Sequence, residues 1–170
     1  MSLEKLKETQ VLILDFAGEE IWVYHRTKKQ IEKNKEAKLS AYDSKYPAWW
    51  PHHKHKTSPE VSQTRTRSKN DTYFIFWGYG PVFGYYVTYL PEKSKDSTNE
   101  LYDLPFIDEK WEGGFIDATN KIAYDFTGRP FIINLPEEKK DKAKLLANLN
   151  LQIPKYIFNK TNSSITLLCK

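Results

Sequence analysis

The segment from residue 111 to residue 129 constrains the fold more than any other part of the chain. It reads W-E-G-G-F-I-D-A-T-N-K-I-A-Y-D-F-T-G-R. Gly113 and Gly114, which follow Trp111, are typical of a strand that enters a tight loop, and Asp125 with Gly128 is typical of a turn. The segment therefore predicts a strand, a loop and a second turn in close succession.

This segment resembles the second cluster-binding loop of the Rieske iron–sulfur subunit of ubiquinol–cytochrome c reductase. The pattern of that family is W-x-G-G-F-x-C-P-C-H-G-S-x-[FY]-D-x-x-G-R, and the two align without a gap. The resemblance places Asp117 where the family has a ligand Cys and Asn120 where it has a ligand His. Thr119 takes the place of a disulfide Cys, and Ile122 that of the Ser that hydrogen-bonds to the cluster.

A second loop of the same kind is predicted upstream. Thr72–Trp77, T-Y-F-I-F-W, is strongly β-forming and predicts a core strand. It leads into Gly78–Tyr86, which lies where the Rieske family has its first cluster loop, G-x-C-T-H-L-G-C-x. In this register Gly80 and Val82 occupy the ligand positions, and Tyr85 occupies a disulfide position.

The N-terminal part predicts a hairpin followed by a helix. Gln10–Tyr24 contains two β-rich runs around a turn at 17–20. Thr27 and Gln30 have the spacing of a capping box, ahead of a lysine-rich helix that ends near Lys38. The order strand, turn, strand, H-R-T, helix also resembles the start of the Rieske soluble domain.

The C-terminal part predicts strands around one short helix. Pro130–Asn134 is a predicted strand, and Pro136–Leu146 has the capping and charge spacing of a short amphipathic helix. Asn150–Tyr156 resembles the N-L-x-V-P-x-Y strand that closes the Rieske domain. Ser164–Leu168 predicts a last strand.

The residue inventory does not provide the ligands of a Rieske centre, which needs two Cys thiolates and two His nitrogens from two facing loops. The chain has one Cys, Cys169, and all its His precede the first loop. We therefore expect no [2Fe–2S] cluster and no metal at the loops. We expect an apolar clamp instead, with Val82 and Ile122 buried between the loops, and with Tyr85 or Tyr124 closing the gap and hydrogen-bonded through its hydroxyl.

Three of the four histidines lie in Ser40–Asn70, a segment rich in proline and polar residues. They are His52, His53 and His55. A divalent metal is one interpretation of this cluster. Because the segment has no Cys and little to fix the ligand geometry, we interpret it as a long solvated loop.

Length and charge set the remaining limits. With 170 residues the chain is long enough for one well-buried domain. Its net charge of +4 is spread over many lysines, which argues against a dedicated nucleic-acid surface. No run approaches the roughly 20 apolar residues of a membrane span. We expect membrane association only through a partner or through an anchor ahead of Met1.

The resemblance implies a mainly β, antiparallel single domain over 1–170, with a two-loop subdomain at about 78–129 and one or two short helices. Without cluster ligands or a complete catalytic constellation, we expect a non-catalytic structural or interaction subunit, with partners in a cytochrome bc1-type respiratory complex. The location implied is the mitochondrial inner membrane facing the intermembrane space, or the periplasmic side of a bacterial inner membrane.

Two alternatives stay open. One is an enzyme or small-molecule-binding protein with a new site near Asp117, Asp125 and Arg129, although the simpler interpretation is that Asp125 and Arg129 tie their turn as an ion pair. The other is a redox-active Rieske subunit, which the ligand inventory disfavours.

Overall fold

The computed structural model describes residues 1–36, 64–81, 84–93, 100–103, 107, 110–130 and 150–168. Several predicted features lie outside these residues. They are Val82, His52, His53, His55, Cys169, the helix over 136–146 and the strand beyond residue 130.

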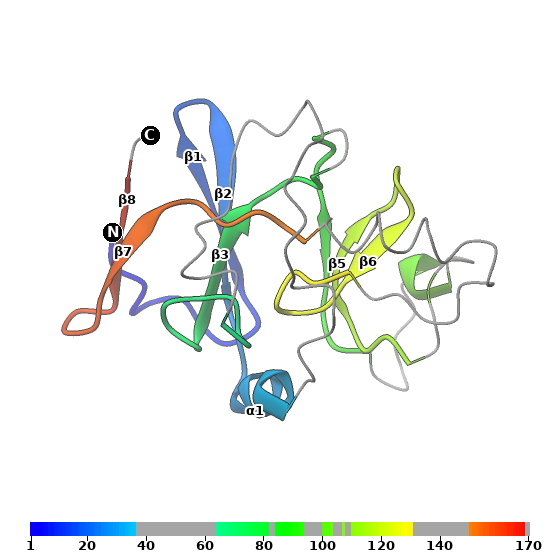
Figure 1. Cartoon of the computed structure of the whole chain (residues 1–170), viewed down its shortest axis with the longest axis horizontal. Coiled ribbons are helices and arrows are strands. Elements are labelled where there is room, and N and C mark those ends of the chain that lie inside the picture. Colours follow the sequence, from blue (N-terminus) through cyan, green and yellow to red (C-terminus); the bar gives the residue numbers. More distant parts are fainter. Residues whose placement is uncertain are drawn as a thin grey trace.

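The described chain is mainly antiparallel β, as predicted, and it forms three small sheets (Figure 1). The first has the order β1 (Val11–Phe16), β2 (Glu19–His25), β3 (Tyr73–Trp77). The second has the order β4 (Thr88–Leu90), β5 (Gly114–Asp117), β6 (Ile122–Tyr124). The third pairs β7 (Tyr156–Asn159) with β8 (Ser164–Leu167).

The hairpin predicted near the N-terminus is present, with a tighter turn than expected. Phe16 pairs with Glu19, so that only Ala17 and Gly18 lie in the turn. Their φ angles of 57° and 79° are both positive, which is the geometry of a two-residue turn matched to the twist of the flanking strands. The remaining two residues of the predicted turn belong to β2.

The predicted capping box is confirmed. Helix α1 (Lys28–Glu36) begins directly after Thr27, whose Oγ1 accepts from the backbone N–H of Gln30 at 3.2 Å. In return, Oε1 of Gln30 accepts from the Thr27 N–H at 3.0 Å. The two side chains thereby satisfy two of the donors that a helix start leaves unpaired. The predicted end of this helix, near Lys38, lies outside the described residues.

The core joins the first sheet to the second. Every residue of β3 is buried, as its composition predicts. The ring centroids of Phe76 in β3 and Phe115 in β5 are 4.6 Å apart. Tyr24 of β2 stacks on Phe126, with a centroid distance of 5.4 Å. In Figure 1 helix α1 lies below the region where these two sheets meet.

A buried arginine after β2 fastens the described end of the predicted long loop, where residues 64–70 form turns and bends. The guanidinium of Arg26 donates to the carbonyl oxygens of Thr66 at 2.6 Å, Asp71 at 2.9 Å and Phe126 at 3.0 Å. Burial lowers the pKa of Arg26 to about 10. The hydrogen bonds to carbonyl dipoles offset part of the cost of burying this cation.

A second buried arginine, Arg67, lies within residues 64–70 and fastens the same segment to other parts of the chain. It donates to the carbonyl oxygens of Thr127 at 2.9 Å, Gly128 at 3.0 Å and Leu151 at 2.7 Å. Residues from three separate parts of the chain are joined by one side chain. Sequence patterns gave no indication of either arginine, because donors to backbone carbonyls have no characteristic spacing.

The strand predicted over 150–156 is wrong in its extent. The segment is largely buried, but its backbone bonds alternate between two partners: the N–H of Leu151 donates to Gly128, and the carbonyl of Gln152 accepts from Trp77. Ladder pairing begins only at Tyr156, after Pro154, which has no N–H to donate. The predicted last strand is confirmed as β8. No helix among the described residues is long and apolar enough to cross a membrane.

Candidate functional site

The first of the two predicted loops forms a narrow excursion between β3 and β4. Tyr79 and Tyr86 form an isolated bridge, and the N–H of Gly80 donates to the carbonyl of Tyr85 at 2.8 Å. Gly84, with a φ of 72°, reverses the chain between them. The exit strand β4 then pairs with β5, which places this loop beside the second one.

The second loop is a hairpin between β5 and β6. Gly114, with a φ of 140°, starts β5, and a Cβ there would lie 2.0 Å from the carbonyl oxygen of Tyr124. Only glycine fits this position. The loop occupies residues 118–121 and closes where Asp117 pairs with Ile122.

The two residues that the resemblance places at ligand positions of the second loop bind each other. Asp117 is fully buried. Its Oδ1 accepts from the backbone N–H of Asn120 at 2.9 Å, and its Oδ2 accepts from Asn120 Nδ2 at 2.6 Å. The carboxylate therefore caps its own loop, and both oxygens are occupied.

The two loops lie against each other, as predicted. A Cβ on Gly80 would lie 2.2 Å from Oδ2 of Asp117, so the backbone of the first loop touches the carboxylate of the second. These are the positions at which the resemblance places one ligand Cys of each loop. Any side chain at position 80 would require Asp117 to move.

The predicted apolar clamp is correct only in part. Ile122 is buried, as expected. Tyr85 is 48% exposed, so it does not close the gap, and Thr119 at the other disulfide position is also exposed. Tyr124 is buried, but within the described part of the chain its hydroxyl has no hydrogen-bond partner. The contact between the loops is polar at Asp117 because its carboxylate finds two donors within its own loop.

Burial makes the Tyr124 hydroxyl a weaker acid. Burial, and next the charge of Asp117, raise the pKa of Tyr124 well above its usual value. Tyr124 therefore stays neutral in the folded protein at any pH near neutrality.

The second turn is tied as predicted, but through the backbone. Oδ1 of Asp125 accepts from the N–H of Thr127 at 2.8 Å and from the N–H of Arg129 at 3.0 Å. The guanidinium of Arg129 donates to the carbonyl oxygens of Thr64 at 3.0 Å and Arg65 at 2.6 Å. Asp125 was expected to pair with the guanidinium of Arg129. It accepts instead from the backbone N–H of Arg129, because the turn brings this amide to the carboxylate.

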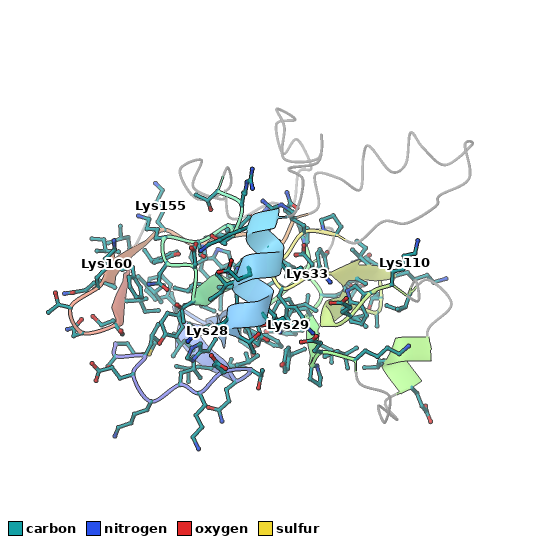
Figure 2. The ribbon with its side chains drawn as sticks, turned by 90° about the horizontal axis from the view of Figure 1, so that it is seen from below. Lys28, Lys29, Lys33, Lys110, Lys155 and Lys160 are labelled. Carbon is teal, nitrogen blue, oxygen red and sulfur yellow. The ribbon has the colours of Figure 1, made fainter. Side chains whose placement is uncertain are left out.

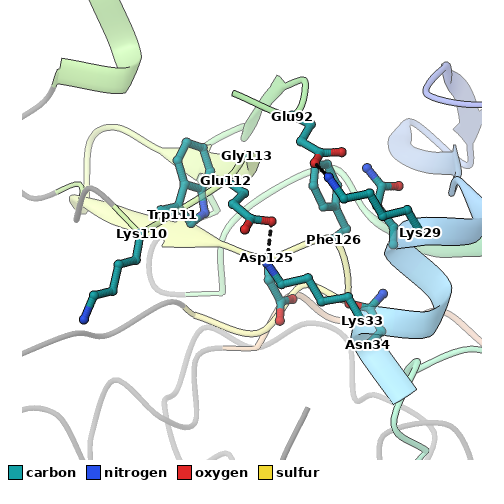
Figure 3. Close-up of a pocket in the computed structure, with 11 residues that line it drawn as sticks. Lys29, Lys33, Asn34, Glu92, Lys110, Trp111, Glu112, Gly113, Asp125 and Phe126 are labelled. Carbon is teal, nitrogen blue, oxygen red and sulfur yellow. Dashed lines mark hydrogen bonds and ion pairs between the residues drawn. The ribbon is translucent and has the colours of Figure 1, made fainter. Parts of the chain in front are cut away.

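The three residues considered for a new site do not all line the pocket that the structure describes beside helix α1. Asp117 is committed to Asn120, whereas Asp125 lines this pocket of about 200 Å³ (Figure 2, Figure 3). Neither Asp117 nor Arg129 is among the described residues that line it. Sequence patterns did not predict this pocket, because helix α1 and the residues that face it are about 60 to 100 positions apart in the chain.

No family model and no curated protein matches the sequence. Within the described residues, no group of three or more His, Cys, Asp and Glu side chains is placed to hold a metal ion. Function must therefore be inferred from the sequence inventory and from the geometry of the two loops and the pocket.

Proposed function

We propose that this chain is a Rieske-like protein without an iron–sulfur cluster, and that it acts as a non-catalytic interaction subunit of a cytochrome bc1-type respiratory complex. One observation carries the proposal. Gly80 and Asp117, at the ligand positions of two loops that resemble the Rieske pattern, are in direct contact. This contact supports the proposal because it pairs the two loops as the resemblance implies, and a carboxylate bound to an amide lies where that family holds its cluster.

The hydrogen bonds of Asp117 suit a structural role. A hydrogen bond to a charged group contributes about 1.5–3 kcal/mol to stability. Asp117 accepts two such bonds from Asn120 in a buried setting. Its oxygens are thus engaged in holding the loop, which is consistent with a domain that binds partners rather than transforms a substrate.

The end of the first loop supplies a surface for a protein partner. Tyr85 and Tyr86 are 48% and 62% exposed, adjacent in sequence and directly after the chain reversal at Gly84. Tyrosine offers a large apolar ring with a polar end, and it is enriched among residues that dominate binding energy at interfaces. We assign the docking surface to this pair of tyrosines.

Co-purification of the native protein from its own membranes tests the proposal. The tagged protein is extracted in mild detergent, and the proteins retained with it are identified by mass spectrometry. We expect subunits of a respiratory complex, and we expect the double variant Tyr85→Ser, Tyr86→Ser to lose them by tenfold or more, since two interface anchors together contribute about 2–4 kcal/mol.

A matched control separates docking from general surface polarity. Ile13 and Ile157 are 50% and 55% exposed and lie on other sheets, so Ile13→Ser with Ile157→Ser removes similar apolar surface elsewhere. This control should retain the partners. Equal retention by both double variants, or recovery of the wild type without respiratory subunits, would refute the proposed function.

A further inference from the structure

Strand β1 leaves one edge of the first sheet open. It is six residues long, it is the outer strand in the order β1-β2-β3, and among the described strands it pairs with β2 alone. At the opposite edge of the sheet, the N–H of Trp77 in β3 donates to the carbonyl of Gln152 at 2.9 Å, so a neighbouring segment covers that side. Within the described part of the chain, no residue of β1 takes part in a backbone hydrogen bond outside its ladder with β2.

The register of the hairpin identifies the backbone groups that are left unpaired. Phe16 and Glu19 flank the two-residue turn, and such a closing pair exchanges both of its hydrogen bonds. Bonded pairs alternate along an antiparallel ladder, so the residues at odd positions of β1 direct their N–H and C=O groups away from β2. These residues are Val11, Ile13 and Asp15. The edge therefore presents a row of free donors and acceptors with which another strand can pair.

The open edge lacks the features that usually prevent strands from pairing, which are lysine, proline and bulges. The strand reads V-L-I-L-D-F, with no lysine or proline, and its register with β2 is continuous. By contrast, β7 has exposed lysines directly before and after it, Lys155 and Lys160 (Figure 2). Strand β1 is thus suited to accept a neighbour.

The side chain in the middle of this edge is apolar and half in water. Ile13 is 50% exposed, whereas its cross-strand neighbour Trp22 on β2 is buried. The other exposed side chain of the strand is that of Asp15. A strand added to β1 would cover the exposed surface of Ile13 and bring a burial gain to the backbone pairing.

The positions of the free groups suit a second copy of this chain. Two β1 strands related by a two-fold axis at Ile13 would pair antiparallel, with Ile13 opposite its counterpart and Val11 opposite Asp15. Each outward residue of one strand then meets an outward residue of the other, so every free donor finds an acceptor. The two Ile13 Cα atoms would be about 5.5 Å apart, which lets the side chains cover each other.

Charge favours this register over the alternatives. Asp15 is the charged residue of the strand, and like charges directly opposite each other destabilise a strand pair. With the axis at Ile13, the two Asp15 residues are about 14 Å apart. An axis at Asp15, or a parallel in-register pair, would bring the two carboxylates together. An axis at Val11 would extend the pairing to Thr9, whose φ of 65° is not extended.

We infer that β1 is a homodimerisation edge, at which two copies join their first sheets through an antiparallel β1–β1 contact with its axis at Ile13. A strand of six residues is roughly 20 Å long, so the contact is smaller than the roughly 1,200–2,000 Å² of a stable interface. The dimer is therefore weak and reversible, with a Kd of about 10–100 µM. This contact is independent of the docking surface at Tyr85 and Tyr86.

Sedimentation equilibrium of the purified protein over a concentration series tests the dimer. The wild type should show a monomer–dimer equilibrium with a Kd in the expected range. Ile13→Lys places two like charges at the axis and removes the apolar contact, so it should weaken the dimer at least tenfold. Ile157→Lys is the matched control, because Ile157 is 55% exposed on β7 and receives the same substitution. Its Kd should equal that of the wild type.

Cysteine cross-linking locates the axis. In a Cys169→Ser background, which has no other thiol, Ile13→Cys places two thiols on residues about 5.5 Å apart, within the range of a disulfide. Asp15→Cys, on the same strand, places them about 14 Å apart, beyond the limit of about 7 Å. Mild oxidation should convert Ile13→Cys to a covalent dimer and leave Asp15→Cys uncross-linked.

Three results would each overturn the inference. They are a wild type that stays monomeric up to about 1 mM, an unchanged Kd in Ile13→Lys, and equal cross-linking of Ile13→Cys and Asp15→Cys. Circular dichroism checks that each variant is folded. If Ile13→Lys proves unfolded, the wild-type Kd and the comparison of the two cysteine variants still decide.

Discussion

Replacing Asp117 by Ala is the most direct test of what holds the two loops in place. The buried carboxylate accepts two hydrogen bonds from Asn120 and lies against the backbone of Gly80. Asp117→Ala removes both acceptors and leaves a void between the loops. Apolar packing alone would make this change nearly neutral, whereas the observed contacts make it destabilising.

The magnitude follows from the contacts. Two hydrogen bonds to a charged group contribute about 1.5–3 kcal/mol each. Asn120 is only partly buried, so water replaces part of what its donors lose. We expect a loss of about 2–4 kcal/mol in the free energy of unfolding, which corresponds to a Tm lower by about 4–16 °C for a chain of this length.

Thermal and urea unfolding of purified variants, with and without a chelator, provide the assay. Asp15→Ala is the control, because Asp15 accepts one long hydrogen bond, 3.3 Å, in an exposed turn. It should cost less than about 0.5 kcal/mol. A cost below about 1 kcal/mol for Asp117→Ala would refute the hydrogen-bond account. A chelator that lowers the wild-type Tm as much as the substitution does would show that a metal occupies the loops.

Four further predictions follow from the same geometry. Gly80→Ala should lower the free energy of unfolding by about 1–3 kcal/mol in the wild type but by markedly less in the Asp117→Ala variant, because the added methyl group would clash with the Asp117 carboxylate. A double-mutant cycle of thermal melts measures this coupling, and additive losses of stability would contradict it. Arg67→Met should lower the free energy of unfolding, measured with urea, by about 3 kcal/mol, since three buried carbonyl groups lose their donor. A decrease of less than about 1 kcal/mol would mean that water replaces the guanidinium as donor. Stability should fall as pH rises above 10, because tyrosines ionise near pH 10 in the unfolded chain while Tyr124 stays neutral when buried; flat stability up to pH 12 would argue against this. The purified protein should be colourless above 320 nm and contain no stoichiometric iron or sulfide; elemental analysis near two irons per chain would contradict it.

Local patterns predicted the local structure well. The hairpin before Thr27 and the capping box itself follow from turn chemistry and residue spacing, which act over a few positions. The opposition of Gly80 and Asp117 was predicted only through the resemblance, because no local rule brings residues so far apart in sequence into contact. The same resemblance led to an apolar clamp, since it gave no indication that Asp117 would find both partners on Asn120.

The buried arginines and the α1 pocket could not be predicted. Arg26 and Arg67 donate to carbonyl groups, which every residue carries, so the sequence holds no complementary partner to search for. Gln30 has an evident role as a capping residue, and its second amide atom becomes unusual only when folding buries it beside Asn34. Such features depend on tertiary closure rather than on spacing.

The ring contacts between the first two sheets bear on how the domain responds to force. Phe115 of β5 packs against Phe76 at 4.6 Å and against Tyr24 at 5.7 Å, so the loop-bearing sheet and the hairpin sheet share one set of buried rings. Amide protons of β5 should therefore exchange with the same opening free energy as those of β3, as expected for one cooperative unit. A partner that pulls on the two loops would then be opposed by the unfolding free energy of both sheets together.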